Sequence, residues 1–436
     1  MDWTKDKISR RRFLQLAGGA ALGAAGAYAL FPALRARFGA ADGALPLGEG
    51  EALHLRQLVA ADNARSRVVQ WHSEAAREDA VLEYRVKGEA ELRAVAAHSR
   101  GFADGGWATQ IHTAQLTNLQ PGTAYEYRVG YEKRRSAWHP LVTDGGGAFK
   151  ALLFPDSQSS DYSDWKRIAQ AARKAHPDAA FFANLGDLVD NGEDPSQWRA
   201  WFGALAGIVD AIPLAPVLGN HETYDLNWKV RLPRAYLQLF ETPPNGSDAL
   251  RNQYYSFDYG DVHFCVLNTQ LEEMLPLQPE LLQAQLAWFE QDMASCAKPW
   301  KIALLHKDVL TYRIRGREGR VAGISEIGRT FMPLFDRWGV DAVLTAHLHT
   351  YRRRARLRDF RPDARGPLYI LTGVAGNVRY PNLWLDHPFD EKVAPQPETN
   401  NYMTLEASAQ ALRFASYLPS GEEIDRVELT KPLAAN

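Results

Sequence analysis

The feature that most constrains the fold of this chain is a set of five short apolar runs, each followed closely by side chains that can bind a metal. Continuous apolar runs of this length are typical of buried strands, and ligands gather in the crevice beyond the carboxyl ends of such strands. Two carboxylates, an amide and three or four imidazoles together form the ligand set of a two-metal hydrolytic centre. The runs span residues 151–154, 179–185, 214–218, 302–305 and 342–345, and the polar residues after them are Asp156, Asp187, Asn220, His221, His306, His347 and His349.

Asp187 is the natural bridge of such a centre, because two ions about 3.5–4 Å apart can share one carboxylate and one water molecule. The charge of both ions lowers the pKa of that water, so that a bridging hydroxide can attack phosphorus in line with the departing oxygen. We predict that the first ion is bound by Asp156, Asp187 and His349, and the second by Asp187, Asn220, His306 and His347.

His221 directly follows the candidate ligand Asn220 and is expected to point past the metals. We predict that it protonates the leaving group or stabilises the transition state, because the pKa of an imidazole lies near the working pH. Any single aspartate or histidine after a strand is more often a loop residue or a helix cap. The prediction therefore rests on the ordered set and on no single position.

Five sequence blocks surround these residues: PDS at 155–157, GDLVD at 186–190, GNHE at 219–222, LH at 305–306 and AHLH at 346–349. In this order they resemble the blocks of the calcineurin-like metallophosphoesterases, and within that superfamily the purple acid phosphatase-like branch. The resemblance runs from about residue 149 to 417. It implies a hydrolase acting on phosphoric esters, two divalent or trivalent ions of manganese, iron or zinc, and two mixed sheets packed face to face with helices outside.

Three positions depart from the pattern of that branch. Purple acid phosphatases have a tyrosine three residues after the second aspartate, and its bond to ferric iron gives their colour. This chain has Asp190 there, so we do not expect a purple protein. Gln158 stands where broader relatives often have a metal-binding histidine, which makes it a candidate for a weak or water-mediated ligand. Ala346 replaces a usual glycine, a change that we expect to be tolerated.

Arginines occupy the segment where related phosphatases have substrate-binding histidines. Arg313 and Arg315 could hold a phosphate group through bidentate hydrogen bonds. A second arginine-rich run spans residues 352–358. We expect it to form a solvated strand face, with Arg352 as its one candidate for substrate binding.

Composition limits the class of protein further. The 436 residues are 46% hydrophobic, which is enough for a large core, and roughly 150 residues per domain predicts two or three units. Fifty basic and 52 acidic residues give a formal net charge of −2, so no basic footprint indicates nucleic-acid binding. Two cysteines exclude a disulfide scaffold.

The amino terminus resembles an export signal. The motif SRRRFL at residues 9–14 is similar to a twin-arginine signal, and a Gly/Ala-rich apolar stretch follows at 16–34. We predict that the folded precursor leaves through the twin-arginine machinery and that cleavage occurs around residues 39–44, giving a periplasmic, cell-surface or secreted protein. An uncleaved membrane tether is the alternative, since about 20 apolar residues span a bilayer.

Residues 53–142 alternate in polarity with the period of half-buried strands. The segment NLQPGTAY at 118–125 resembles the turn and tyrosine of a fibronectin type III-like sandwich, with Trp71 as a core aromatic. Such a module precedes the catalytic domain of plant-type purple acid phosphatases. We expect it to be a structural support beside the active-site mouth, and binding to a polymer or cell surface is the alternative.

We therefore predict an α/β metallophosphoesterase sandwich preceded by an all-β domain, with catalytic helices near 165–174, 198–209, 280–293 and 327–338. The expected reaction is hydrolysis of small phosphate monoesters. A phosphodiesterase or nucleotide phosphohydrolase with the same site is one alternative, and a non-catalytic surface-binding protein is another. The predicted units are a signal or anchor at 1–44, the fibronectin-like domain at 52–143, the catalytic domain at 148–420, and a terminal strand and tail at 421–436.

Overall fold

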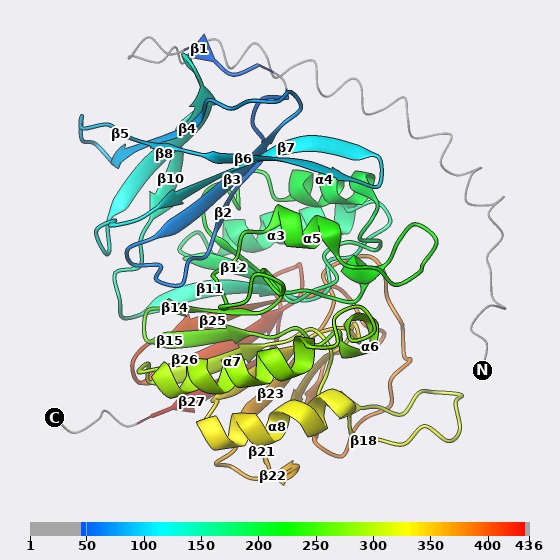
Figure 1. Cartoon of the computed structure of the whole chain (residues 1–436). Coiled ribbons are helices and arrows are strands. Elements are labelled where there is room, and N and C mark those ends of the chain that lie inside the picture. Colours follow the sequence, from blue (N-terminus) through cyan, green and yellow to red (C-terminus); the bar gives the residue numbers. More distant parts are fainter. Residues whose placement is uncertain (1–44, 49, 432–436) are drawn as a thin grey trace.

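The computed structural model describes residues 45–48 and 50–431 (Figure 1). The predicted export signal or anchor at 1–44 lies outside the described residues. Within the described part of the chain, none of the helices combines the length and apolar character that crossing a membrane requires.

The amino-terminal part is an all-β sandwich, as predicted. Trp71 lies in its core and donates a hydrogen bond to the Tyr131 hydroxyl at 2.9 Å, while the Tyr125 hydroxyl accepts one from the Gln120 amide at 2.9 Å. One sheet contains β1 (Leu45–Pro46), β4 (Ala80–Val86), β5 (Arg93–Ala96), β8 (Ala124–Tyr131), β9 (Arg134–Arg135) and β10 (His139–Val142). The facing layer contains β2 (Leu53–Leu58), β3 (Arg67–Ser73), β6 (His98–Asp104) and β7 (Trp107–Leu116).

The sandwich is joined to the catalytic unit through a shared sheet. Its strand β2 pairs in parallel with β13, with Leu58 opposite Leu214, so one ten-stranded sheet runs in the order β27-β26-β25-β11-β12-β13-β2-β3-β7-β6. The catalytic strands of this sheet are β11 (Phe149–Phe154), β12 (Phe181–Asn184), β13 (Leu214–Pro216), β25 (Tyr402–Ala407), β26 (Ala411–Tyr417) and β27 (Glu423–Thr430). The two predicted domains therefore share backbone hydrogen bonds as well as side-chain contacts.

A second, seven-stranded sheet faces the catalytic half of the first, and apolar side chains of both sheets fill the space between them. Both sheets mix parallel and antiparallel pairs, which confirms the predicted architecture. The second sheet contains β14 (Tyr255–Tyr259), β15 (Val262–Val266), β16 (Trp300–Leu304), β19 (Ala342–Thr345), β23 (Leu368–Thr372), β20 (Tyr351–Arg354) and β24 (Asp390–Val393). Two small hairpins pair β17 (Leu310–Thr311) with β18 (Gly323–Ile324), and β21 (Leu357–Arg358) with β22 (Arg361–Pro362).

Helices cover the outer faces of both catalytic sheets (Figure 1). Helices α3 (Ser163–Ala175), α4 (Pro195–Ala204) and α5 (Arg234–Leu239) pack between the catalytic strands and the sandwich strands of the first sheet. Helices α6 (Leu271–Met274), α7 (Leu281–Ser295) and α8 (Glu326–Trp338) pack against the second sheet. The prediction that the helix at 198–209 continues to its last residue is wrong. It ends at Ala204 because the chain turns through Gly207, whose left-handed φ of 83° is easiest for glycine.

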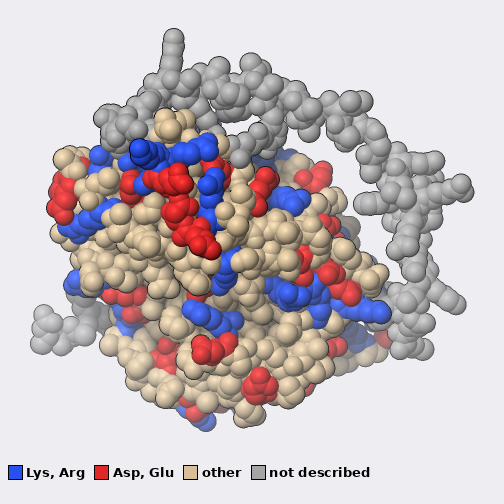
Figure 2. Space-filling view, turned by 45° about the horizontal axis from the view of Figure 1, so that its top comes forward, with Lys and Arg blue, Asp and Glu red and all other residues tan. Residues whose placement is uncertain are grey.

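Surface charge agrees with the near-neutral composition. On the face drawn in Figure 2, acidic and basic side chains lie interspersed, as the formal net charge of −2 leads one to expect. Both cysteines are free thiols, with Cys265 buried and Cys296 half-buried.

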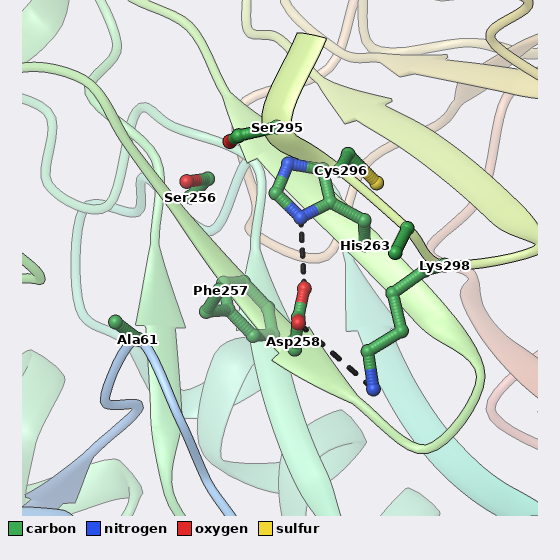
Figure 3. Close-up of a pocket in the computed structure, with 9 residues that line it drawn as sticks. Ala61, Ser256, Phe257, Asp258, His263, Ser295, Cys296 and Lys298 are labelled. Atoms are coloured by element: carbon green, nitrogen blue, oxygen red, sulfur yellow. Dashed lines mark hydrogen bonds and ion pairs between the residues drawn. The ribbon is translucent and has the colours of Figure 1, made fainter. Parts of the chain in front are cut away.

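A cavity of about 350 Å³ lies beside the edge of the second sheet and has none of the predicted metal ligands in its lining (Figure 3). Both ring nitrogens of His263 are engaged there, Nδ1 at 2.8 Å from Asp258 and Nε2 at 2.9 Å from Asp292. Burial lowers the pKa of His263, but the hydrogen bonds and charges of the two carboxylates outweigh it and raise the pKa to about 9. The ring therefore acts as a charged link between these two aspartates.

Candidate metal centre

The predicted ligands converge where strands of the two facing sheets end. Strands β11, β12 and β13 are parallel neighbours in the first sheet, and β16 and β19 are parallel neighbours in the second. The carboxyl ends of parallel strands lie at the same edge of a sheet, so the loops after them meet. Those loops carry Asp156, Asp187, Asn220, His306, His347 and His349.

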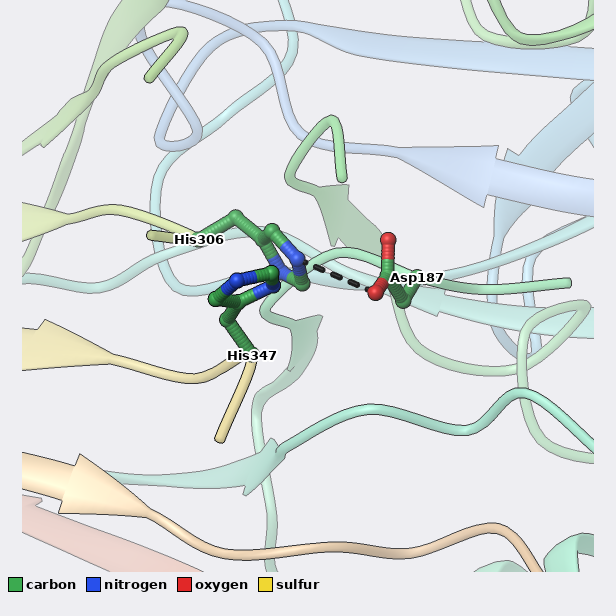
Figure 4. A group of neighbouring side chains, drawn as sticks. All are labelled: Asp187, His306 and His347. Atoms are coloured by element: carbon green, nitrogen blue, oxygen red, sulfur yellow. Dashed lines mark ion pairs between the residues drawn. The ribbon is translucent and has the colours of Figure 1, made fainter. Parts of the chain in front are cut away.

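Two groups of side chains in this region could each hold a metal ion. One group contains Asp156, Asp187 and His349, the other contains Asp187, His306 and His347, and within each group the ligand atoms lie within 4.8 Å of one another. Asp187 belongs to both groups, as a bridging carboxylate must. In Figure 4 the His306 and His347 rings point toward the Asp187 carboxylate, with His306 Nε2 at 3.1 Å from Asp187 Oδ2.

The backbone orients the histidine rings for metal binding. Nδ1 of His306 lies 2.9 Å from the Leu185 carbonyl, and Nδ1 of His349 lies 2.6 Å from the Val378 carbonyl. A carbonyl can only accept, so both Nδ1 atoms carry a proton, which leaves Nε2 of each ring as the metal-binding atom. Nε2 of His349 lies 3.3 Å from an oxygen of Asp156.

His347 and Asn220 complete the second group in different ways. Nδ1 of His347 is buried and has no hydrogen-bond partner, the state of a ligand nitrogen awaiting a cation. The side-chain oxygen of Asn220 lies 3.1 Å from Nε2 of His306. Buried carboxylates, neutral imidazole nitrogens and an amide oxygen form a donor set that fits manganese, iron or zinc.

The charge state of the site reflects its burial and the charges of its neighbouring side chains. Burial alone would raise the pKa of Asp187, but the positive charges of His306 and His221 hold it well below its usual range. Burial would lower the pKa of His306, and the Asp187 charge instead raises it to about 9. Burial, followed by the charge of His306, holds the pKa of His347 well below its usual value, which keeps this ring neutral as a metal ligand must be.

Backbone conformations at the centre are unusual. Asp187, His347 and His349 have φ values of 47°, 76° and 53°, in the left-handed region that non-glycine residues seldom adopt. Strain of this kind persists where surrounding contacts fix it, and it concentrates at functional sites. Gly219 is required for a related reason: a Cβ atom there would lie 2.1 Å from the Asp187 nitrogen.

Glu222 supports the site, a role that the sequence analysis does not predict. Its Oε2 accepts hydrogen bonds from the amides of Asp187 at 3.1 Å and Gly219 at 2.8 Å, and its Oε1 accepts one from Val189 at 3.1 Å. It thereby joins the loops of the second and third sequence blocks. Burial, with the Asp187 charge, raises the pKa of Glu222 to about 8, and bound cations would oppose that increase.

His221 lies beside Asp187 without belonging to either ligand group. Its backbone amide donates to Asp187 Oδ1 at 2.9 Å, its Nδ1 lies 2.7 Å from the Asp190 carbonyl, and its Nε2 lies 3.9 Å from Asp187 Oδ2. The Nδ1 proton is therefore committed to the backbone. Nε2 is left as the atom that can exchange a proton at the centre.

The remaining predicted residues are placed as follows. Gln158 is buried, and neither atom of its amide group has a hydrogen-bond partner, so its role as a weak ligand stays a prediction. Arg313 and Arg315 are exposed, and Arg315 donates to the Asn382 carbonyl at 3.0 Å. Their substrate-binding role also stays a prediction.

The expectation that the arginine run forms a solvated face needs correction. Arg352 is buried and pairs with Asp386 at 2.9 Å and Asp390 at 2.6 Å, and its substrate-binding role stays a prediction. Arg354, expected on a solvated face, is also buried and pairs with Asp308 at 2.5 Å. Strand β20 lies between β23 and β24, which explains why these side chains are enclosed.

Known protein domains match the two parts of this fold. Residues 53–143 match the purple acid phosphatase N-terminal domain, and residues 138–351 match the calcineurin-like phosphoesterase domain. The chain thus combines a segment similar to the first of these domains with a segment similar to the second.

Several curated proteins and solved structures that are similar to this chain are named as acid phosphatases. Purple acid phosphatase 15 of Arabidopsis thaliana is 26% identical over 331 residues, which cover 66% of this chain and 57% of the relative. Acid phosphatase type 7 of Mus musculus is 26% identical over 331 residues, covering 66% and 71%. The solved structure of purple acid phosphatase PPD1 from yellow lupin seeds has a similar fold, with a TM-score of 0.74 at 18% identity over 87% of this chain and 74% of that one.

Proposed function

We propose that this protein is an exported, dinuclear metal-dependent phosphoesterase that hydrolyses small phosphate monoesters. The observation that carries the proposal is the convergence of two ligand groups on one shared carboxylate, Asp187, with His221 directly beside it. Two bound ions of manganese, iron or zinc would supply the nucleophile by lowering the pKa of a shared water, and would offset the charge of the phosphate group.

The chain's own residues hold that chemistry in place. The His347 amide donates to both oxygens of Asp156, at 3.1 and 2.9 Å, and so fixes one carboxylate against the loop that carries two histidines. The Leu185 and Val378 carbonyls fix the rings of His306 and His349. These contacts fix the directions of the donor atoms, and donors that are fixed in this way need little reorganisation during the reaction.

The proposal assigns His221 the role of general acid. With Nδ1 bonded to the Asp190 carbonyl, a protonated ring can donate only from Nε2, which lies on the Asp187 side. As the ester bond breaks, that proton can pass to the departing oxygen, and transfer of this kind contributes about 10²- to 10⁴-fold to a rate.

Elemental analysis of the natively exported protein, followed by paired assays with its metal restored, tests the proposal. Turnover of 4-nitrophenyl phosphate above that of bis(4-nitrophenyl) phosphate is the expected result. A diester rate far above the monoester rate would replace the proposal with a phosphodiesterase. If neither ester is cleaved by protein holding two metals, a surface-binding function of the sandwich replaces it.

Export through the twin-arginine machinery is part of the same proposal and is supported by the motif at residues 9–14. Replacing Arg10 and Arg11 with lysine should retain the precursor inside the cell. Unchanged export of that variant, measured by cell fractionation, would contradict the proposal. A product that is exported at full length and stays with the membrane would favour the tether over a cleaved signal.

A further inference from the structure

An exposed tryptophan lies next to the candidate general acid. Trp228 is 55% exposed. The centroid of its ring lies 5.8 Å from the centroid of the His221 ring, and the two ring planes meet at 87°. The Tyr224 ring is 6.0 Å away on the same loop. Trp228 therefore contacts the proton donor with part of its ring system while much of its surface faces solvent.

The loop that carries Trp228 is fixed by hydrogen bonds. The Trp228 amide donates to the Asp225 carbonyl at 2.8 Å, and the Lys229 amide donates to the Asp225 carboxylate at 2.9 Å. The side chain of Asn191 donates to the same Asp225 carbonyl at 2.7 Å. We call residues 225–229 the tryptophan loop. Because Asn191 lies four residues after Asp187, its hydrogen bond connects the tryptophan loop to the metal-binding loop.

The backbone of Trp228 is in an unfavourable conformation. Its φ is 61°, in the left-handed region that glycine or asparagine adopts easily and a bulky side chain does not. This conformation costs free energy, and more than half of the Trp228 surface nevertheless stays exposed. A position that keeps a large apolar ring under these conditions is better explained by contact with a ligand than by stability.

The role proposed for His221 brings the leaving group of a phosphoester close to this ring. Hydrolysis forms a P–O bond to the water oxygen and breaks the ester P–O bond, and the departing oxygen takes the proton from His221 Nε2. The group attached to that oxygen therefore lies beside His221, where Trp228 borders the site. A second exposed ring, Tyr380, lies 4.8 Å from His349 in the first ligand group.

We propose that Trp228 forms the leaving-group subsite and selects phosphoesters whose leaving group carries an aromatic ring. The inference rests on the proposed function, because the role of His221 defines where the leaving group lies. An offset or edge-to-face contact between two rings adds about 0.5–1.5 kcal/mol beyond the burial of apolar area. A preference of about threefold to tenfold follows from that energy.

Benzyl phosphate and cyclohexylmethyl phosphate provide the comparison. Both release a primary alcohol of similar size, and only the first offers an aromatic face. The wild type should favour the benzyl ester in kcat/KM, and Trp228→Leu should lower the ratio about threefold to tenfold. Trp228→Phe should restore most of the ratio. Leu226→Ala is the matched control, since Leu226 lies in the same loop at 54% exposure, and this change should leave the ratio as in the wild type.

Calorimetric binding of benzylphosphonate and cyclohexylmethylphosphonate gives a readout without turnover. The wild type should bind the benzyl compound more tightly, and Trp228→Leu should lose that difference. If the wild type cleaves neither ester, the proposed function fails, and the phosphonates still decide the inference. If both esters are cleaved with an equal ratio in the wild type and Trp228→Leu, the function stands and the inference is overturned. Equal binding of the two phosphonates by the wild type also overturns it.

Discussion

Replacing Glu222 with glutamine should loosen the loop of Asp187 without removing any metal ligand. Glu222 accepts three backbone hydrogen bonds, two at Oε2 and one at Oε1. The single oxygen of a glutamine can keep the two bonds to Asp187 and Gly219. The NH₂ group of the glutamine side chain then faces the Val189 N–H. Because both groups are hydrogen-bond donors, the Val189 N–H loses its acceptor.

The size of the effect follows from that count. A buried donor that loses its acceptor costs about 1–3 kcal/mol, and we expect the free energy of unfolding of the metal-free protein to fall by this amount. Residues that hydrogen-bond to metal ligands and orient them typically affect metal affinity about 10- to 100-fold. Glu222→Gln should therefore weaken binding of the metals that share Asp187 by one to two orders of magnitude, roughly.

Denaturant unfolding of metal-free protein and calorimetric metal titration provide the two measurements. Glu83→Gln is the matched control, because this carboxylate pairs with Arg128 and Arg135 in the amino-terminal sandwich, away from the metal centre. It should lower stability and leave metal affinity unchanged. If Glu222→Gln binds both metals as the wild type does, Glu222 contributes only stability and the argument for ligand positioning is wrong.

Four other substitutions separate roles within the molecule. His221→Ala should keep both metals and slow turnover about 10²- to 10⁴-fold, whereas His347→Ala should lose one metal per chain. Elemental analysis distinguishes the two variants. Metal loss in His221→Ala, or two retained metals in His347→Ala, would contradict the assigned roles. Arg354→Met should cost about 3–5 kcal/mol in urea unfolding because Asp308 stays buried without its partner, and a cost under about 1 kcal/mol would refute this. The pKa of His263 is about 9 in the folded state and near 6.5 in the unfolded state. The stability lost in His263→Gln should therefore be largest below about pH 6.5 and decline as the pH rises toward 9. A stability loss that stays constant over this pH range would contradict the prediction.

The strands of the catalytic core could be predicted because they are buried on both faces. Such strands have continuous apolar sequences, and their ends coincide with the first polar residue. The ligands at 156, 187, 306 and 349 follow from this local rule together with the meeting of parallel strand ends. Helix ends are harder to predict, as the turn at Gly207 demonstrates, because one left-handed residue outweighs a favourable apolar period.

The support of the site could not be predicted in the same way. Glu222 acts through three backbone N–H groups whose positions depend on left-handed turns at the metal-binding loops. Trp228 lies in a loop with no periodic pattern, so only the folded chain places it beside His221. The burial of Arg354 could not be predicted because its carboxylate partner Asp308 is 46 positions away in the sequence.

The packing of the amino-terminal sandwich bears on its function. Gly105 lies near the tip of the β6–β7 hairpin, and an added Cβ there would lie 1.9 Å from the Glu193 carbonyl. Arg231 forms ion pairs of 2.6 Å with Asp104 of that hairpin and with Glu193. The other oxygen of Glu193 accepts from the Leu226 amide at 2.8 Å, within the tryptophan loop. These contacts favour the supporting role over binding to a polymer or cell surface. Because the hairpin tip holds the loop of the proposed leaving-group subsite, changes at this interface should alter substrate preference before they alter metal binding.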